Sequence, residues 1–137
     1  MKLRILYCIA ISWFSVTAYA QSSDQPIAPE LVGKWCYINL AVTNDQITSS
    51  CITLNSDGTY DAALDRSTLP NGTSLPIQQD NDTGKWWFAN NRLFYNSSNH
   101  GQGFFTFQKA NHPRLENTPM ILLNGIAFAT ASPKDPW

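Results

Sequence analysis

The feature that most constrains the fold is a succession of short runs, apolar or alternating, that extends from residue 31 to residue 131. Turn residues separate these runs at close, fairly regular spacing. No stretch keeps an apolar period of about 3.6 residues for long enough to predict a helix. Short strands divided in this way are typical of an antiparallel sandwich or barrel. We therefore predict strands at residues 34–42, 49–55, 59–64, 84–88, 92–96, 104–109, 120–123 and 126–131.

Tight turns favour one of these two architectures. The segments 55–58, 89–91 and Asn124-Gly125 read as hairpin turns. Consecutive strands joined largely by hairpins are enough to close a small up-and-down barrel, and closure removes the exposed edges that a secreted β protein must avoid. An immunoglobulin-type sandwich is the rival, but its usual cysteine pair spans two sheets with a wider separation. We expect an all-β, antiparallel up-and-down barrel of about eight strands, formed by residues 31–131.

The first twenty residues have the three parts of a secretory signal. Lys2 and Arg4 precede an apolar stretch at 5–16, and Ala18-Tyr19-Ala20 supplies a small-x-small cleavage site. A membrane span would need about 20 apolar residues, which this stretch does not reach. We expect 1–20 to be removed, 21–30 to form a flexible leader, 132–137 to form a tail, and the product to be secreted or periplasmic.

Two cysteines remain after cleavage, because Cys8 leaves with the signal. In an oxidising compartment Cys36 and Cys51 are expected to form one disulfide. If Thr43-Asn44 is the centre of the first hairpin, Cys36 lies directly opposite Cys51, as a cross-strand disulfide requires. A redox or metal site is the alternative, but the spacing is not C-x-x-C and neither cysteine has a neighbouring histidine.

The charge of the mature chain restricts its partners. Cleavage removes two basic residues and no acid, so nine basic and ten acidic residues become seven and ten. No basic run is present, and clustered Lys and Arg are what nucleic acids and anionic membranes require. We expect neither as a partner. A small apolar molecule or a protein remains, and we expect no cofactor.

Three short motifs carry a resemblance to a known family. Gly33-Lys34-Trp35 resembles the G-x-W motif that opens the first strand of lipocalins, and Gly84-Lys85-Trp86 resembles the G-x-W that bacterial lipocalin-like domains show mid-chain. Asp57-Gly58-Thr59-Tyr60, in a hairpin, is similar to the same group. The resemblance covers residues 31–131 and implies a ligand-binding barrel whose floor is closed by Trp35. The chain is shorter than a typical lipocalin and lacks the C-terminal helix. Small secreted barrels that inhibit lysozyme are another similar group, but this chain lacks their characteristic binding-loop motif.

Aromatic residues are the candidate ligand contacts. Trp86 and Trp87 are adjacent on a predicted strand and must point to opposite faces, so one of them is exposed or lies on an interaction surface. An interior lined by aromatic rings can hold an apolar ligand, or the rings can simply fill the core of a short chain. The candidate ligand-binding residues are Trp86, Trp87, Phe94, Phe105 and Phe107.

No motif points to catalysis. The chain has no G-x-S-x-G and no H-E-x-x-H, and we predict no catalytic residue, no metal site and no enzyme. His100 and His112 fall in loops at opposite ends of one strand, which favours two solvated side chains over a joint site.

Two functions from different classes remain open. One is a lipocalin-like barrel that holds a small apolar ligand. The other is a secreted interaction module, an inhibitor or adaptor, that uses loop 65–82 or an exposed aromatic residue.

Overall fold

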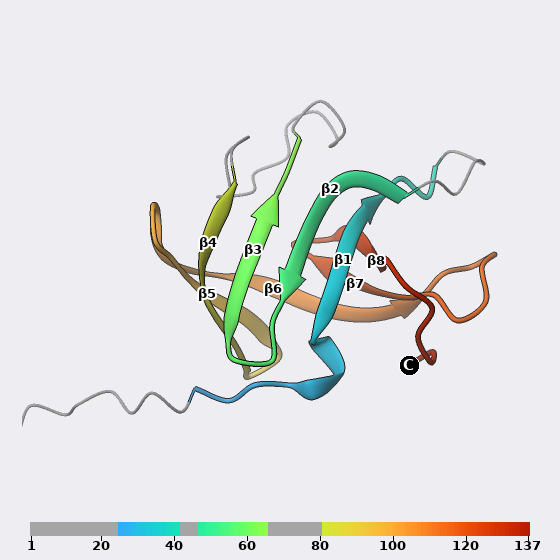
Figure 1. Ribbon diagram of the computed structural model, residues 1–137. Coiled ribbons are helices and arrows are strands. Elements are labelled where there is room, and N and C mark those ends of the chain that lie inside the picture. Colours follow the sequence, from blue (N-terminus) through green and yellow to red (C-terminus); the bar gives the residue numbers. More distant parts are fainter. Residues whose placement is uncertain (1–24, 42–46, 66–80) are drawn as a thin grey trace, which may run out of the picture.

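The structure is a computed structural model and describes residues 25–41, 47–65 and 81–137. In this part of the chain eight antiparallel strands close into a barrel, each strand pairing with its neighbours in sequence and the last with the first (Figure 1). The strands are β1 (Gly33–Ile38), β2 (Ile47–Leu54), β3 (Thr59–Ala63), β4 (Asp82–Ala89), β5 (Arg92–Ser97), β6 (Gly101–Asn111), β7 (Pro119–Leu123) and β8 (Ile126–Thr130). The predicted fold class is confirmed.

Helical structure in the described ranges is limited to the short 3₁₀ helix η1 (Pro29–Leu31). None of the helices in those ranges has the length and hydrophobicity to cross a membrane. The predicted signal, most of loop 65–82 and the Thr43-Asn44 turn lie outside the described residues.

The disulfide joins the first two strands. Cys36 pairs with Cys51 in the β1–β2 register and is bonded to it, as predicted. The register then slips by two residues, because Ile38 pairs with Ile47 rather than with Ser49. β1 therefore ends at Ile38, whereas the predicted strand continued to residue 42. The Asn39 side chain accepts a 3.0 Å hydrogen bond from the Ala41 backbone N–H, which turns the chain there.

The second correction concerns β6, which extends from Gly101 to Asn111 although the predicted strand covered only residues 104–109. Gly103 pairs with Tyr95, and a Cβ at Gly103 would lie 2.2 Å from the Tyr95 hydroxyl. The glycine therefore leaves the space that the tyrosine side chain occupies. Gly101-Gln102-Gly103, which reads as a loop, is thus the start of a strand, because packing against its neighbour decides its conformation.

Alternate residues of every strand face the interior and form one core. Trp35, Trp86 and Phe128 are its largest fully buried side chains. The buried members of the core are Leu31, Trp35, Tyr37, Ile52, Leu54, Tyr60, Ala62, Leu64, Trp86, Leu93, Tyr95, Phe105, Phe107, Ile121, Leu123 and Phe128. Each large apolar side chain buried in this way stabilises the fold by about 1.5–3 kcal/mol.

Residues on both flanks of the barrel domain pack against one end of it. The Trp35 indole N–H donates a 2.8 Å hydrogen bond to the Leu31 carbonyl, and the Trp137 ring stacks on Trp35 with centroids 6.1 Å apart. Pro26 accepts a 3.0 Å hydrogen bond from the Phe88 backbone N–H. Residues 25–30, assigned to a leader, and Trp137, assigned to a tail, thus contribute contacts to the folded domain.

Candidate functional site

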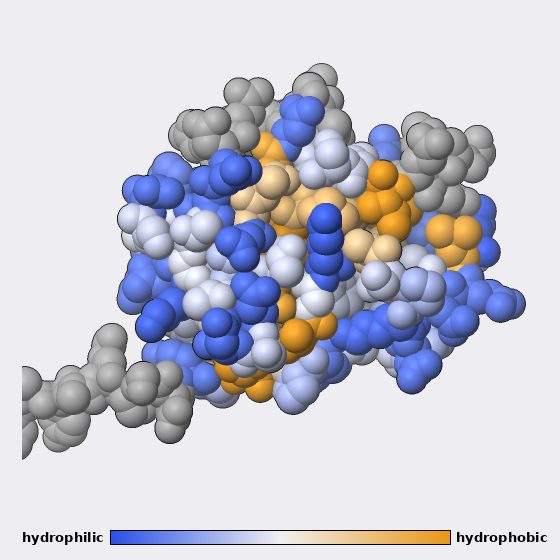
Figure 2. Space-filling view, viewed as in Figure 1, coloured by the Kyte–Doolittle hydropathy of each residue, from blue (hydrophilic) through white to orange (hydrophobic). Residues whose placement is uncertain are grey.

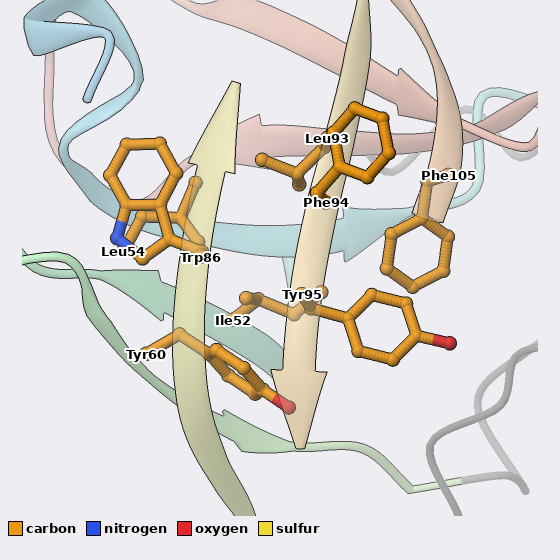
Figure 3. Close-up of a pocket in the computed structure, with 8 residues that line it drawn as sticks. All are labelled: Ile52, Leu54, Tyr60, Trp86, Leu93, Phe94, Tyr95 and Phe105. Atoms are coloured by element: carbon orange, nitrogen blue, oxygen red, sulfur yellow. The ribbon is translucent and has the colours of Figure 1, made fainter. Parts of the chain in front are cut away.

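The interior of the barrel holds three of the five candidate ligand-binding residues. Trp86, Phe105 and Phe107 are all buried in the core. The cavity beside Trp86 and Phe105 has a volume of only about 10 Å³, and side chains from neighbouring strands crowd around it (Figure 3). A single water molecule needs about 10–15 Å³ by this measure. The cavity that Trp86 and Phe105 line therefore has no room for a small-molecule ligand.

A buried carboxylate lies among these rings. Asp82, at the start of β4, is 2% exposed and accepts 2.7 Å hydrogen bonds from the Tyr60 and Ser97 hydroxyls. The Ser97 hydroxyl also accepts hydrogen bonds from the backbone N–H groups of Asn99 and His100, at 3.1 and 2.9 Å. The network therefore fixes the turn between β5 and β6.

The same network changes the chemistry of Tyr60. Burial, followed by the hydrogen bond to Asp82 and the charge of that carboxylate, raises the pKa of Tyr60 above its ordinary value of 10.0. Tyr60 therefore stays protonated and acts as a hydrogen-bond donor. Because Asp82 is enclosed and hydrogen-bonded, this group has the features of a structural network. Sequence reasoning placed Asp82 in a loop and missed it, since its partners come from other strands.

The remaining two candidates, Trp87 and Phe94, contribute to the outer surface, and Phe94 also lines the small cavity in Figure 3. Trp87 pairs with Phe94, and Phe94 pairs with Phe104, so one ring from each of β4, β5 and β6 lies in a continuous row. The Trp87 and Phe94 rings are stacked, with centroids 5.5 Å apart and planes within 4° of parallel. The Phe94 and Phe104 centroids are 5.8 Å apart. Phe104 is 47% exposed, while Trp87 and Phe94 are half-buried.

Polar rows flank this aromatic row on the same face of the sheet. Side chains two positions apart on a strand share a face. The residues two positions before and two positions after each ring therefore also point outward. Pairing aligns them into Lys85–Asn96–Gln102 on one side and Ala89–Arg92–Thr106 on the other. We call these nine residues the outer grid. Its members are Lys85, Trp87, Ala89, Arg92, Phe94, Asn96, Gln102, Phe104 and Thr106.

The charge of the outer grid is entirely positive. Lys85 and Arg92 are its charged residues, and both are exposed. The Arg92 guanidinium lies over the Phe104 ring, 4.6 Å from its centroid. A cation on an aromatic face is attracted by the ring electrons, which holds Arg92 beside the aromatic row.

Another exposed apolar area differs in composition. Figure 2 shows apolar side chains gathered over the ends of β1 and β2. Ile47, at the start of β2, is 39% exposed, and Leu40 is half-buried. These side chains are aliphatic, whereas the outer grid combines aromatic rings with arginine. Aromatic residues and arginine are enriched in the energetic centres of protein interfaces.

Sequence reasoning found part of the outer grid. It named Trp87 and Phe94 and predicted that Trp86 and Trp87 point to opposite faces, which their burial confirms. It missed Phe104 and chose Phe105, which faces the interior. Two signals were present in the chain. A two-residue turn at Asn90-Asn91 places Trp87 opposite Phe94. Adjacent aromatic residues on a strand must also face opposite sides.

The two histidines lie on either side of β6. His100 is exposed in the preceding turn, whereas His112 is buried after the strand. The His112 Nδ1 atom accepts hydrogen bonds from the backbone N–H groups of Arg114 and Leu115, at 3.0 and 2.9 Å. The prediction of two solvated histidines is therefore wrong for His112. Within residues 25–41, 47–65 and 81–137, no three His, Cys, Asp or Glu side chains are grouped to hold a metal ion.

Comparison of the chain with protein-family models, with curated proteins and with solved structures finds no significant match. The geometry described above is therefore the basis for inferring function.

Proposed function

We propose that this protein is an exported, non-enzymatic binding protein that recognises a protein partner through the outer grid of β4, β5 and β6. The observation that carries the proposal is the row of Trp87, Phe94 and Phe104 on the outside of a barrel whose cavity beside Trp86 is too small for a ligand. Large aromatic side chains left in contact with water lose the free energy that their burial would contribute. Covering this row with a partner recovers that contribution.

The closed barrel restricts how a partner binds. Each strand of the described barrel is hydrogen-bonded on both sides over at least part of its length, so no strand offers a partner strand one entire open edge. Closure therefore favours recognition through side chains on the outer surface. The outer grid offers Trp87, Arg92 and Phe104 together, which are residue types that dominate binding energy at protein interfaces.

The compartment is part of the proposal. A disulfide between Cys36 and Cys51 is typical of proteins that fold in an oxidising environment. Together with the signal-like residues 1–20, it supports a secreted or periplasmic location.

The lipocalin-like alternative has one supporting feature, the closed eight-stranded barrel. A ligand in its interior would have to displace core side chains such as Trp86 and Phe105. The packed interior therefore favours the outer surface as the binding site. The other alternative, loop 65–82, falls mainly outside the described residues.

Site-specific photo-crosslinking in the source compartment tests the proposal. A photoreactive phenylalanine analogue replaces Phe104, and the same analogue replaces Leu115, which is also apolar and 39% exposed but lies outside the outer grid. We expect a discrete protein adduct from position 104 and none from position 115. The adduct is identified by mass spectrometry and the partner is purified.

Calorimetric titration with that purified partner then measures the contribution of the row. We expect Trp87→Ser and Phe104→Ser each to weaken binding about tenfold or more, the equivalent of about 1.4 kcal/mol, because both remove a buried anchor from the interface. Leu115→Ser is the control and should bind as the unsubstituted protein does. Equal binding by all three variants would refute the proposal.

A further inference from the structure

We infer that the outer grid recognises an acidic, extended segment of its partner, with two carboxylates placed on either side of an apolar side chain. This inference rests on the proposed function and adds the chemistry of the partner. It is drawn from three features of the grid: the distribution of charge, the spacing of its two cations, and the way its rings are packed.

Charge is segregated along the chain. All ten acidic residues lie outside residues 83–115, whereas that segment contains Lys85, Arg92, Lys109 and Arg114. The outer grid therefore presents cations, whereas exposed acids such as Asp57, Asp61 and Glu116 lie outside it. An acidic partner is attracted to this face and repelled elsewhere, which gives both orientation and selectivity.

The cations occupy the two outer rows of the grid. Lys85 lies two residues before Trp87 on β4, and Arg92 pairs with Ala89, two residues after it. Four residues of strand span about 14 Å at about 3.4 Å per residue. An extended segment that runs along the strands has side chains i, i+2 and i+4 on one face, with the same spacing. The matching pattern is acid-x-apolar-x-acid, with the apolar side chain over the aromatic row.

Donor groups in each row suit carboxylates. Arg92 offers a planar fork that binds a carboxylate through two hydrogen bonds, and its position over Phe104 restricts its motion before binding. Lys85 shares its row with the exposed amides of Asn96 and Gln102, which provide further N–H donors. No carboxylate of the grid itself competes for these donors.

The packing of the rings favours a peptide over a nucleic acid or a polysaccharide. The Trp87 and Phe94 rings stack on each other, and Arg92 lies over Phe104, so one face of each of these rings is already in contact with a grid residue. Bases bind aromatic residues by stacking on open ring faces. Two cations are also few for a polyanion, whose affinity depends on many phosphate contacts.

Fluorescence anisotropy with short labelled peptides tests this inference on the mature chain. The probe is Gly-Asp-Thr-Phe-Thr-Glu-Gly, and two matched peptides replace both acids with lysine or replace phenylalanine with alanine. We expect the acidic probe to bind at least about tenfold more tightly than either, because each control removes one of the two recognised features. Equal affinity for the acidic and lysine peptides would overturn the inference.

Charge reversal in the protein provides the second arm. Arg92→Glu and Lys85→Glu should each weaken binding of the acidic probe about tenfold, and Arg92→Glu should improve binding of the lysine peptide. Lys34→Glu makes the same change of charge at an exposed position outside the grid and should leave the affinity unchanged. If Lys34→Glu weakened binding of the acidic probe as much as Arg92→Glu or Lys85→Glu, net charge alone would control the affinity. That result would overturn the inference.

Two outcomes separate this inference from the proposed function. If substitution of Phe104 weakens binding of the purified partner but substitution of Arg92 or Lys85 does not, the grid binds a protein and the inference of an acidic segment is wrong. If the partner does not depend on Phe104, the proposed function itself is wrong. Tighter binding of heparin or of single-stranded oligothymidine than of the acidic probe would assign the grid to a polyanion and overturn the inference.

Discussion

At the scale of single residues, Tyr60 combines an apolar ring in the barrel core with a hydroxyl that donates to Asp82. Its pKa is raised above 10.0 in the folded protein, by burial first and by Asp82 second. Burial likewise raises the pKa values of Tyr37 and Tyr95. When pH rises above 10, the unfolded chain loses these protons while the folded protein keeps them. The stability that is fully present below pH 10 is therefore lost progressively in alkali.

We expect the urea midpoint to fall between about pH 9 and about pH 11, where unperturbed tyrosines ionise. Tyr60→Phe removes one of the groups responsible and should make this fall shallower. The same variant should be less stable at neutral pH by about 1–3 kcal/mol, because it deprives Asp82 of a buried donor. Recovery of the midpoint on return to pH 8 controls for chemical damage. An unchanged slope in Tyr60→Phe would show that this hydroxyl does not contribute.

At the scale of elements, the β1–β2 hairpin is fastened by a disulfide close to the place where its register changes. Cys36 and Cys51 are paired and bonded, and two residues later Ile38 pairs with Ile47. The disulfide therefore links the two strands at the end of the regularly paired segment, residues 33–36 of β1 and 51–54 of β2. The prediction that these cysteines lie opposite each other depended on an assumed hairpin centre at Thr43-Asn44, and their pairing was confirmed. The register slip depends on how the strands pack and was not visible in the sequence.

Removal of the disulfide should lower the free energy of unfolding. The bridge links residues 15 positions apart, and in the chain-entropy model closure of such a loop contributes about 3 kcal/mol. We expect Cys36→Ala/Cys51→Ala to lose about this amount in urea denaturation while keeping the β-sheet circular dichroism. Reduction of the unsubstituted protein with dithiothreitol should give a similar loss. An unchanged midpoint in both experiments would contradict a stabilising role.

At the scale of the whole molecule, closure of the barrel separates two sets of aromatic residues. Phe105 and Phe107 are buried in the core, where the cavity beside Phe105 is too small for a ligand, whereas Phe104 faces outward and packs with Phe94. β6 thus contributes side chains both to the core that stabilises the fold and to the outer grid, the surface proposed to bind a partner. The interior and the surface are expected to respond differently to substitution.

Benzene distinguishes a filled interior from a ligand-binding one. The thermal midpoint of the unsubstituted protein should not rise in benzene, because its cavity is too small to admit the ring. Phe105→Ala should lose about 3–5 kcal/mol of stability and open an apolar cavity, and benzene should then raise its midpoint. Phe104→Ala is the outward-facing control and should show neither effect. Stabilisation of the unsubstituted protein by benzene would favour the lipocalin-like alternative.

Local alternation and turn chemistry determined much of this fold before any contact was known. They predicted eight strands and the neighbouring positions of Cys36 and Cys51. They also predicted the opposite faces of Trp86 and Trp87, because side-chain direction along a strand depends only on its period of two. They did not bring Asp82 to Tyr60 and Ser97, or Phe104 to Phe94 and Arg92. Those contacts depend on strand register and barrel closure, which long-range packing decides. The tertiary structure alone therefore turned separate aromatic and basic residues into one outward-facing surface.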